Sequence, residues 1–331
     1  MLNIEKTLIA FRQLRVMIIG DLMLDQYYYG KVDRISPEAP VPVVTIAEKE
    51  VRLGGAANVA LNIKTLGAEP VLVGIVGADL PGEELCQLLK EQHISDASVF
   101  KSKKRKTTVK TRVLSLGKQL IRLDEEDTYW LLPMEFQSIL PDILRKIENK
   151  EIDVILFQDY NKGLLSQNLI ERVLEVAGKL KIPVAVDPKK DNFLTYKKVN
   201  LFKPNLREIN ENLPFTTSPN LKELKKAARY LREKIDNKLT LITLSERGVY
   251  YSDGHQGAIL PTEPRNIADV CGAGDSVFSV AALAMAAHVP INDIAVLSNL
   301  AGGQVCERVG VVPVSPRKLI DDYNALIKNS D

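Results

Sequence analysis

Short apolar segments recur along this chain, and most are followed by a stretch with helical periodicity. Buried strands are predicted at 15–20, 70–75, 152–157, 183–186 and 239–244, and helices at 56–66, 166–180 and 272–287. Apolar strands that alternate with amphipathic helices are typical of a mostly parallel sheet covered on both faces. No repeat and no linker rich in Pro, Gly or Ser interrupts this pattern, so we expect one α/β domain over residues 1–331.

Two segments do not fit the alternation of strand and helix. Residues 30–53 contain Pro37, Pro40 and Pro42 and alternate like exposed strands, while residues 107–124 read as a hairpin that turns at 116–118. We expect both to form a small antiparallel sheet, a flap, that projects from the main body. Such a flap could close over a ligand, and its free edges favour pairing with a second copy, which predicts a homodimer.

The charge balance argues against several classes of partner. The 331 residues include 44 Lys and Arg against 42 Asp and Glu, a net charge of +2, which gives no signal for nucleic acid or a membrane surface. The basic run at 101–106 is interpreted as a solvated loop. No apolar run reaches the roughly 20 residues of a membrane span, and residues 1–15 resemble an amphipathic helix and not a signal peptide.

The cysteines indicate the compartment. Cys86, Cys271 and Cys306 lie far apart without a CxxC pair, which argues against a disulfide framework and against a zinc site. A reducing cytoplasm is the expected location.

A glycine-rich loop near the C-terminus carries the strongest chemical signal. Asp269 is followed by Gly272-Ala273-Gly274-Asp275 and then by a helix-forming run. Converging backbone N–H groups and the positive end of the helix dipole would bind a phosphate. A carboxylate beside a phosphate is unfavourable unless it has a role such as accepting a proton from an attacking hydroxyl. Helix capping with a tight turn is an equally good explanation of this loop alone, and a dinucleotide site is weaker because the third Gly of G-x-G-x-x-G is missing.

A second glycine pair lies near the N-terminus. Gly54 and Gly55 begin a predicted helix, and Asn58 about one turn later would offer an amide to hydroxyl groups. Taken alone, these small residues are better explained by close helix packing.

Together these motifs resemble the ribokinase-like (PfkB) carbohydrate kinases. The resemblance rests on Gly54-Gly55-x-x-Asn58, on Asp269-x-x-Gly272-Ala273-Gly274-Asp275, on Asn205-x-x-Glu208 and on the segment 243–248, and it covers about residues 15–316. It implies a three-layer α/β/α sandwich with a small β flap as a lid. It also implies ATP and Mg²⁺, with K⁺ as a further possible cofactor of the family. Asn205 and Glu208 would hold Mg²⁺ mainly through water, and Thr243, Ser245 and Gly248 would lie on the nucleotide side.

Within that family the chain looks similar to the heptose 7-phosphate kinases of lipopolysaccharide precursor synthesis. The resemblance is carried by the segments 20–30, 34–44, 119–124, 159–163, 187–189 and 203–208. It implies transfer of phosphate from ATP to the C1 hydroxyl of D-glycero-β-D-manno-heptose 7-phosphate. Such kinases are often fused to a nucleotidyltransferase domain; this chain is expected to hold the kinase alone.

The resemblance assigns roles to individual residues. Asp275 would be the catalytic base, with the amides of Gly272, Ala273 and Gly274 stabilising the transferring phosphoryl group. The sugar hydroxyls would meet Asp21, Asp25, Gly54, Gly55 and Asn58. The substrate's own phosphate needs a cationic anchor, for which the candidates are Arg34, Arg112 and Arg122 on the flap segments, with Lys110, Lys162, Lys189 and Lys190 behind them. The family often has Thr or Ser where this chain has Cys271, a change that leaves the backbone donors intact.

Two other functions remain open on the sequence. Another sugar kinase of the same family, acting on ribose, fructose or a fructose phosphate, would share the fold and Asp275. A sugar- or nucleotide-binding regulator without turnover is the alternative from a different class, and the intact base argues against it.

Overall fold

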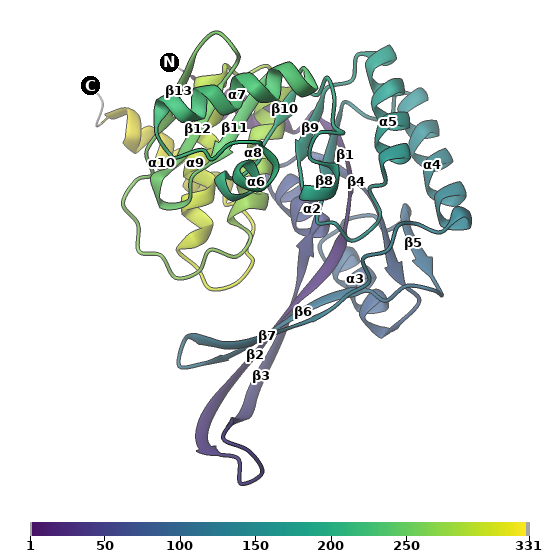
Figure 1. The fold of residues 1–331 in the computed structure, drawn as a ribbon, viewed down its shortest axis with the longest axis vertical. Coiled ribbons are helices and arrows are strands. Elements are labelled where there is room, and N and C mark those ends of the chain that lie inside the picture. Colours follow the sequence, from purple (N-terminus) through teal and green to yellow (C-terminus); the bar gives the residue numbers. More distant parts are fainter. Residues whose placement is uncertain (1, 329–331) are drawn as a thin grey trace.

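The computed structural model describes residues 2–328 (Figure 1). Its helices are α1 (Ile4–Phe11), α2 (Ala56–Thr65), α3 (Leu80–Glu91), α4 (Pro133–Glu148), α5 (Gln167–Leu180), α6 (Leu206–Asn212), α7 (Leu221–Ile235), α8 (Ala273–Ala286), α9 (Ile291–Cys306) and α10 (Pro316–Lys328), with 3-10 turns η1 (Lys190–Asn192) and η2 (Ser245–Arg247). Its strands are β1 (Arg15–Gly20), β2 (Leu22–Ile35), β3 (Pro42–Gly55), β4 (Glu69–Gly77), β5 (Val99–Ser102), β6 (Thr108–Ser115), β7 (Lys118–Glu125), β8 (Val154–Gln158), β9 (Val184–Asp187), β10 (Leu201–Phe202), β11 (Leu239–Thr243), β12 (Val249–Ser252) and β13 (Gly257–Leu260).

The main sheet has nine strands in the order β13-β12-β11-β10-β9-β8-β1-β4-β5. Every pair from β5 to β11 is parallel, and only β12 and β13 run antiparallel to their neighbours. The predicted mostly parallel sheet is therefore confirmed. The five predicted strands correspond to β1, β4, β8, β9 and β11, and the three predicted helices to α2, α5 and α8.

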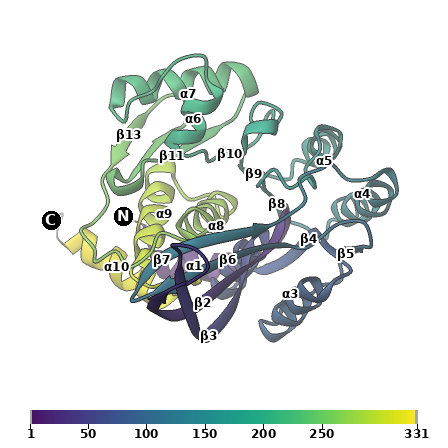
Figure 2. The same cartoon turned by 60° about the horizontal axis from the view of Figure 1, so that its bottom comes forward.

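Helices cover both faces of this sheet, which makes the three-layer sandwich (Figure 2). Successive side chains of β1 point to opposite faces, so Val16 and Ile18 belong to one buried cluster and Met17 and Ile19 to the other. The first cluster includes side chains of α1, α2, α8, α9 and α10, and the second those of α4, α5 and α7. Burial on both faces explains why β1 reads as a continuous apolar run.

The flap is a separate sheet in the order β3-β2-β6-β7, and it extends away from the main body (Figure 1). It consists of two antiparallel hairpins that are joined by parallel pairing of β2 with β6. The second hairpin turns at Leu116 and Gly117, which both have positive φ, as predicted from this segment. The flap starts at Leu22 and not near residue 30, so its first hairpin is longer than expected.

Polar caps fix where several helices begin. The side chains of Ser166 and Asn220 accept a hydrogen bond from the third residue of α5 and α7, respectively. Between residues 2 and 328, no helix has both the length and the apolar character that crossing a membrane requires.

Candidate active site

The loop before α8 is shaped by glycine. Gly272 has a φ of 76°, in the left-handed region, and a Cβ there would lie 3.2 Å from Asn58 Nδ2. A Cβ added at Gly274 would meet no atom within 4 Å, so the backbone of the first turn faces open space. The N–H group of Ala273 donates to the Val270 carbonyl oxygen at 3.3 Å. The backbone at Gly274 lies beside room for a ligand, as a phosphate site requires.

Asp275 is the third residue of α8, and its carboxylate is held by three donors. Asn58 Nδ2 donates to Oδ2 at 2.8 Å, while Gln158 Nε2 and the Tyr160 hydroxyl donate to Oδ1 at 3.0 and 2.7 Å. These donors come from α2, from the end of β8 and from the loop after β8. The two glycine motifs, far apart in the sequence, therefore meet at this carboxylate.

Burial sets the acidity of Asp275. Burial raises the pKa of this carboxyl to about 6, against the opposite effect of the hydrogen bonds from Asn58 and Tyr160; the charge of Asp187 also raises it, and that of Lys203 lowers it. A carboxylate with a pKa near neutrality is suited to accept a proton from a substrate hydroxyl. Its place in the first turn of α8, where the helix dipole favours negative charge, helps to keep it ionised.

The first glycine pair is explained mainly by close packing. A Cβ at Gly54 would lie 2.2 Å from Asp25 Oδ2, and Gly55 has a φ of 56° with its Cβ position 2.5 Å from the Asp21 carbonyl oxygen. Asn58 follows at the start of α2, fully buried. Its amide is engaged at both ends, because Nδ2 bonds Asp275 and Oδ1 accepts from Asn62 at 3.2 Å. Asn58 therefore contacts the predicted base, and its contact with a sugar hydroxyl stays a prediction.

Asp21 has a structural role at the end of β1. Its buried carboxylate accepts hydrogen bonds from the backbone N–H groups of Tyr160, Lys162 and Leu164, at 2.8, 3.1 and 3.4 Å. These bonds attach the loop after β8 to the end of β1. Contact of Asp21 with ring hydroxyls stays a prediction.

Asp25 is paired with an arginine of the flap. Arg112 Nη1 lies 2.5 Å from Asp25 Oδ1, and both side chains are almost fully buried. The guanidinium also lies 5.4 Å from the ring centroid of Tyr27. The predicted sugar ligand and one predicted phosphate anchor thus neutralise each other in this structure.

The other predicted basic anchors do not converge. Arg122 is exposed and bonds Asp124 at 2.8 Å. Arg34 is exposed near the far end of β2, seven residues beyond Tyr27, which is the register partner of Arg112. At about 3.3 Å per residue, this places Arg34 roughly 20 Å from Arg112 along the strand. Arg34 and Arg112 therefore do not converge within a single chain, and the identity of the phosphate anchor stays a prediction.

Lys189 lies beside the start of α6. It forms an ion pair with Glu208, which is buried at the start of α6. Asn205 and Glu208 also cap this helix reciprocally, since Asn205 Oδ1 accepts from the Glu208 N–H and Glu208 Oε2 from the Asn205 N–H, both at 2.8 Å. Lys189 therefore belongs with the predicted magnesium residues and not with the flap arginines.

The predicted nucleotide-side residues lie next to this cap. Asn205 forms a parallel β-bridge with Thr243, at the end of β11. Gly248 has a φ of 91°, and a Cβ there would clash with the Leu260 carbonyl oxygen, while Ser245 is exposed in the turn between them. The predicted magnesium and nucleotide residues are thus adjacent in space.

The side-chain oxygen atoms of Asn205 and Glu208 are suited to a magnesium ion that is bound through water. Asn205 and Glu208 supply oxygen atoms, the kind of ligand that Mg²⁺ prefers. The cap and Lys189 occupy those oxygens already. Among residues 2–328, no three Asp, Glu, His or Cys side chains cluster to bind a metal directly. Outer-sphere contact is therefore the role that these two residues fit.

Cys271 has the environment of an unreactive thiol. Its side chain is half-buried, and burial raises its pKa to about 11. The departure from Thr or Ser leaves the loop intact, because Asp269 accepts hydrogen bonds from the N–H groups of Cys271 and Gly310, at 3.1 and 2.9 Å.

Sequence reasoning missed several groups around Asp275. Gln158 and Asp187 end β8 and β9, and Gln158 Nε2 lies 3.3 Å from Asp187 Oδ2. Asp187 in turn pairs with the buried Lys203 at 3.1 Å. The available signal was that polar residues end two adjacent apolar strands of a parallel sheet, where ligands bind. Tyr160 gave no such signal.

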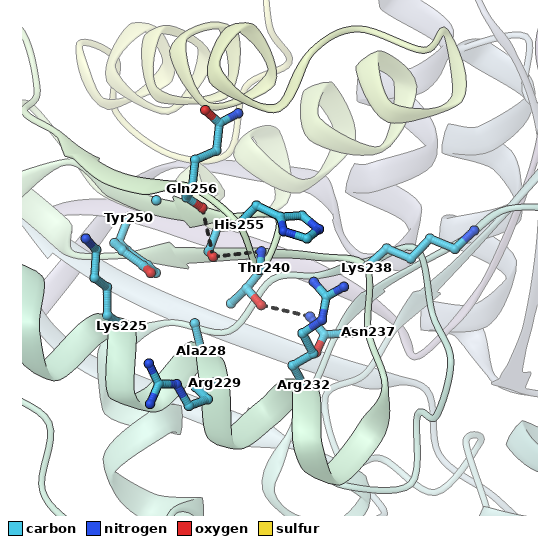
Figure 3. A pocket seen from close by; sticks show the side chains of 13 residues that line it. Lys225, Ala228, Arg229, Arg232, Asn237, Lys238, Thr240, Tyr250, His255 and Gln256 are labelled. Atoms are coloured by element: carbon cyan, nitrogen blue, oxygen red, sulfur yellow. Dashed lines mark hydrogen bonds between the residues drawn. The ribbon is translucent and has the colours of Figure 1, made fainter.

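A hollow elsewhere in the molecule takes in none of these residues. It has a volume of about 280 Å³ and lies between α7 and the β12–β13 hairpin, surrounded by Lys225, Arg229, Arg232 and Lys238 (Figure 3). Thr240 lines it at the start of β11, whereas Thr243 is at the other end of that strand. The candidate site therefore lies at the carboxyl ends of the strands, apart from this hollow.

Comparison with solved structures supports the fold. Phosphofructokinase-2 from Escherichia coli, solved in complex with substrates and products, superposes with a TM-score of 0.80 at 19% identity, over 95% of this chain and 99% of that one. Ribokinase from Arabidopsis thaliana, complexed with ribose and ATP, gives a TM-score of 0.73 at 16% identity, over 93% of this chain and 98% of that one. At these identities the likeness concerns the fold alone.

Sequence comparison shows nearer relatives. The bifunctional protein HldE of Syntrophotalea carbinolica is 36% identical over 319 residues, and the HldE of Geobacter metallireducens is 36% identical over 339 residues. These alignments cover 96% and 99% of this chain but 64% and 68% of the relatives' lengths. The pfkB family carbohydrate kinase model matches residues 13–318. With that match over nearly the whole length, and with the two glycine motifs meeting at Asp275, this chain belongs to the pfkB family of carbohydrate kinases.

Proposed function

We propose that this kinase transfers the γ-phosphoryl group of ATP to the C1 hydroxyl of D-glycero-β-D-manno-heptose 7-phosphate, a step in lipopolysaccharide precursor synthesis. The observation that carries the reaction is the buried Asp275 beside the open first turn of α8. The sugar rests on the resemblance of the segments around Asp21, Asp159, Asp187 and Lys203 to heptose 7-phosphate kinases, and the relatives named HldE support it.

In the proposed reaction, Asp275 takes the proton of the sugar hydroxyl as the oxygen attacks the γ-phosphorus in line, and ADP leaves from the opposite side. The N–H groups of Gly272 and Gly274 would stabilise the charge of the transferring phosphoryl group, and that of Ala273 would join them on leaving the Val270 carbonyl oxygen. Magnesium would neutralise charge on the ATP phosphates, held through water by Asn205 and Glu208. Lys189 lies beside Glu208 and would add a positive charge there. Thr243, Ser245 and Gly248 would border the nucleotide.

The substrate's phosphate needs a cation on the flap side of Asp275. Lys110 lies on β6 with its Nζ 5.0 Å from the ring centroid of Tyr160, whose hydroxyl bonds Asp275. It is half-buried, and no carboxylate of residues 2–328 forms an ion pair with it. A half-buried ammonium group without an ion-pair partner fits an anionic ligand, so Lys110 is the candidate anchor that we favour, beside Arg112 and Arg122.

We also propose that two copies of the chain pair through their flaps. Within the chain, β3 and β7 are the outer strands of the flap sheet, with free edges. Ile35, Ile121 and Leu123 on this sheet, and Val41 in the connection between β2 and β3, are at least half exposed. Sedimentation that finds only monomer at micromolar concentration would contradict the dimer.

The function is tested by ADP release with a panel of sugars, in the presence of Mg²⁺ and with or without K⁺. The panel consists of D-glycero-β-D-manno-heptose 7-phosphate, ribose, fructose and fructose phosphates. The proposal expects kcat/KM for the heptose phosphate to exceed every other sugar by at least two orders of magnitude. The K⁺ arm is included because a neighbouring phosphofructokinase-2 structure is a complex with potassium. Preference for another sugar would retain Asp275 and discard the heptose assignment.

A further inference from the structure

Tyr160 connects the predicted base to the rest of the site. Its hydroxyl donates to Asp275 Oδ1 at 2.7 Å, and its backbone N–H is bonded by Asp21 at 2.8 Å. Two ammonium groups lie near its ring, Lys110 Nζ at 5.0 Å and Lys189 Nζ at 5.5 Å from the centroid. The loop after β8 is thus attached to the end of β1 through the Tyr160 backbone. The Tyr160 side chain reaches Asp275 on α8, and the ammonium groups of Lys110 and Lys189 lie near its ring.

The hydrogen bonds of Asp275 leave one acceptor position open. An ionised carboxylate has about four lone-pair positions, two on each oxygen. Oδ1 accepts from both Gln158 and Tyr160, and Oδ2 accepts from Asn58. Within residues 2–328 no further donor reaches this carboxylate, so the open position is on Oδ2.

We propose that Tyr160 is a positioning residue for Asp275: by bonding Oδ1, it orients the carboxylate so that Oδ2 faces the sugar hydroxyl, and it keeps the carboxylate ionised. This inference rests on the proposed function, in which Asp275 is the base. In the step, the sugar O–H bond breaks, its proton moves to Oδ2, and the oxygen uses the released electron pair to form the bond to the γ-phosphorus of ATP. The bond from that phosphorus to the bridging oxygen breaks at the same time, and ADP leaves with its electron pair. Tyr160 keeps its own proton throughout.

The groups around the two side chains support this division of roles. Burial raises the pKa of Tyr160 well above its usual value, and the charge of Asp275 raises it further, so the phenol stays a donor. Asp275 faces Asp187 from β9, whose charge raises its pKa, and Lys203 after β10, whose charge lowers it. Tyr160 also faces Lys110 on β6, Lys189 after β9 and the charge of Asp25 on β2. Of the three side chains that donate to Asp275, Tyr160 is the one with a hydroxyl.

Removal of the hydroxyl is the direct test. In Tyr160→Phe, the pH profile of kcat/KM should keep its shape. Its acidic limb, the rise in kcat/KM as Asp275 loses its proton, should shift to a pH about one unit higher, the size expected for a lost hydrogen bond to a charged group. At pH 8 to 9, where Asp275 is ionised in either protein, most of the activity should return. Tyr28→Phe is the matched control, because its hydroxyl contacts Gln26 in the flap at 3.3 Å. The same substrate is used throughout, so that its own phosphate ionisations cancel in the comparison.

The outcomes separate the inference from the function it rests on. If Tyr160→Phe lowers kcat/KM equally at every pH, with an unchanged melting temperature, Tyr160 does not act on the ionisation of Asp275 and the inference fails alone. If Asp275→Asn keeps substantial turnover, the assignment of the base fails and with it the proposed mechanism. A shifted limb in Tyr160→Phe, with Tyr28→Phe like wild type and Asp275→Asn inactive, supports both.

Discussion

Asn58 Nδ2 donates a hydrogen bond of 2.8 Å to Asp275 Oδ2 across 217 residues of sequence. The bond joins the start of α2 to the start of α8, and both side chains are buried. It explains why two glycine motifs at opposite ends of the chain belong to one site: each glycine segment lets a helix begin close to the other helix. The catalytic proposal and the packing of α2 against α8 therefore depend on the same pair.

Asp275→Asn should abolish most of the turnover. The amide cannot accept a proton, and at least one of its atoms would face the donors of Asn58, Gln158 or Tyr160 in place of a carboxylate oxygen. We expect kcat to fall by about 10²- to 10⁴-fold, the usual contribution of a general base. Calorimetry should show ATP binding nearly unchanged. Asp269→Asn is the control within the same loop, and equal loss of kcat in both variants would mean that only loop structure had been disturbed.

Asn58→Ala should affect stability and activity together. It removes a buried donor to Asp275 and leaves Asn62 without one of its acceptors, so the free energy of unfolding should fall by about 1–3 kcal/mol. The acidic limb of the pH profile of activity should also shift to higher pH, because a hydrogen bond to the ionised carboxylate of Asp275 is lost. Urea unfolding and pH profiles measure the two effects.

Asn62→Ala distinguishes the two effects of the Asn58 variant. Asn62 is also a buried amide, which accepts from the Val314 N–H at 3.0 Å, but it does not touch Asp275. Asn62→Ala should lower the free energy of unfolding without shifting the acidic limb of the pH profile. A limb that moves equally in both variants would refute the specific role of Asn58.

Periodicity predicted the central fold because its strands are buried on both faces. The segments at β1, β4, β8, β9 and β11 are apolar enough to be recognised singly. β12 and β13 were not predicted, since residues 249–260 mix Tyr, Ser, Asp and Gly without an apolar run or a clear alternation. Parallel pairing of β2 with β6 was also beyond prediction, because it joins strands separated by α2, β4, α3 and β5.

The candidate site was predictable where a motif is local and not where strand order decides. Gly272 and Asp275 lie only three residues apart in the sequence, so the motif alone predicted that they belong to one site. Gln158 and Asp187 meet because β8 and β9 are neighbours, and Asp21 bonds the loop after β8 because β1 pairs with β8. That order is a property of the folded sheet. The distance of Arg34 from Arg112 could not be predicted, because the length of the flap strands depends on pairing that the sequence does not display.

Glu208→Gln should weaken the response to magnesium. Gln keeps an oxygen for the Asn205 N–H but loses the charge that faces Lys189, and this charge would also attract the hydrated ion. We expect the Mg²⁺ concentration at half-maximal rate to rise by about 10- to 100-fold, as for other groups that act on a metal indirectly. The KM for the sugar should change little.

Glu211→Gln is the control for the magnesium prediction. Glu211 lies on the same helix, in an exposed ion pair with Arg207 at 2.6 Å. Its loss should leave the magnesium response unchanged. If Glu208→Gln behaves like this control, Glu208 is a helix cap and nothing more.

Arg112→Ala should destabilise the protein far more than Arg122→Ala, although both residues lie on the flap and pair with aspartates. Arg112 is buried, so its removal leaves the carboxylate of Asp25 without its partner in a dry environment, at a cost of about 3–5 kcal/mol. Arg122 is half exposed beside Asp124, and such pairs contribute about 1 kcal/mol or less. Unfolding in urea measures the difference.

The double variant Arg112→Ala with Asp25→Asn should regain part of the lost stability, because no uncompensated charge remains. If both single variants unfold at the same urea concentration, the Asp25–Arg112 pair does not hold the base of the flap, and Arg112 would then be free to bind the phosphate of the substrate.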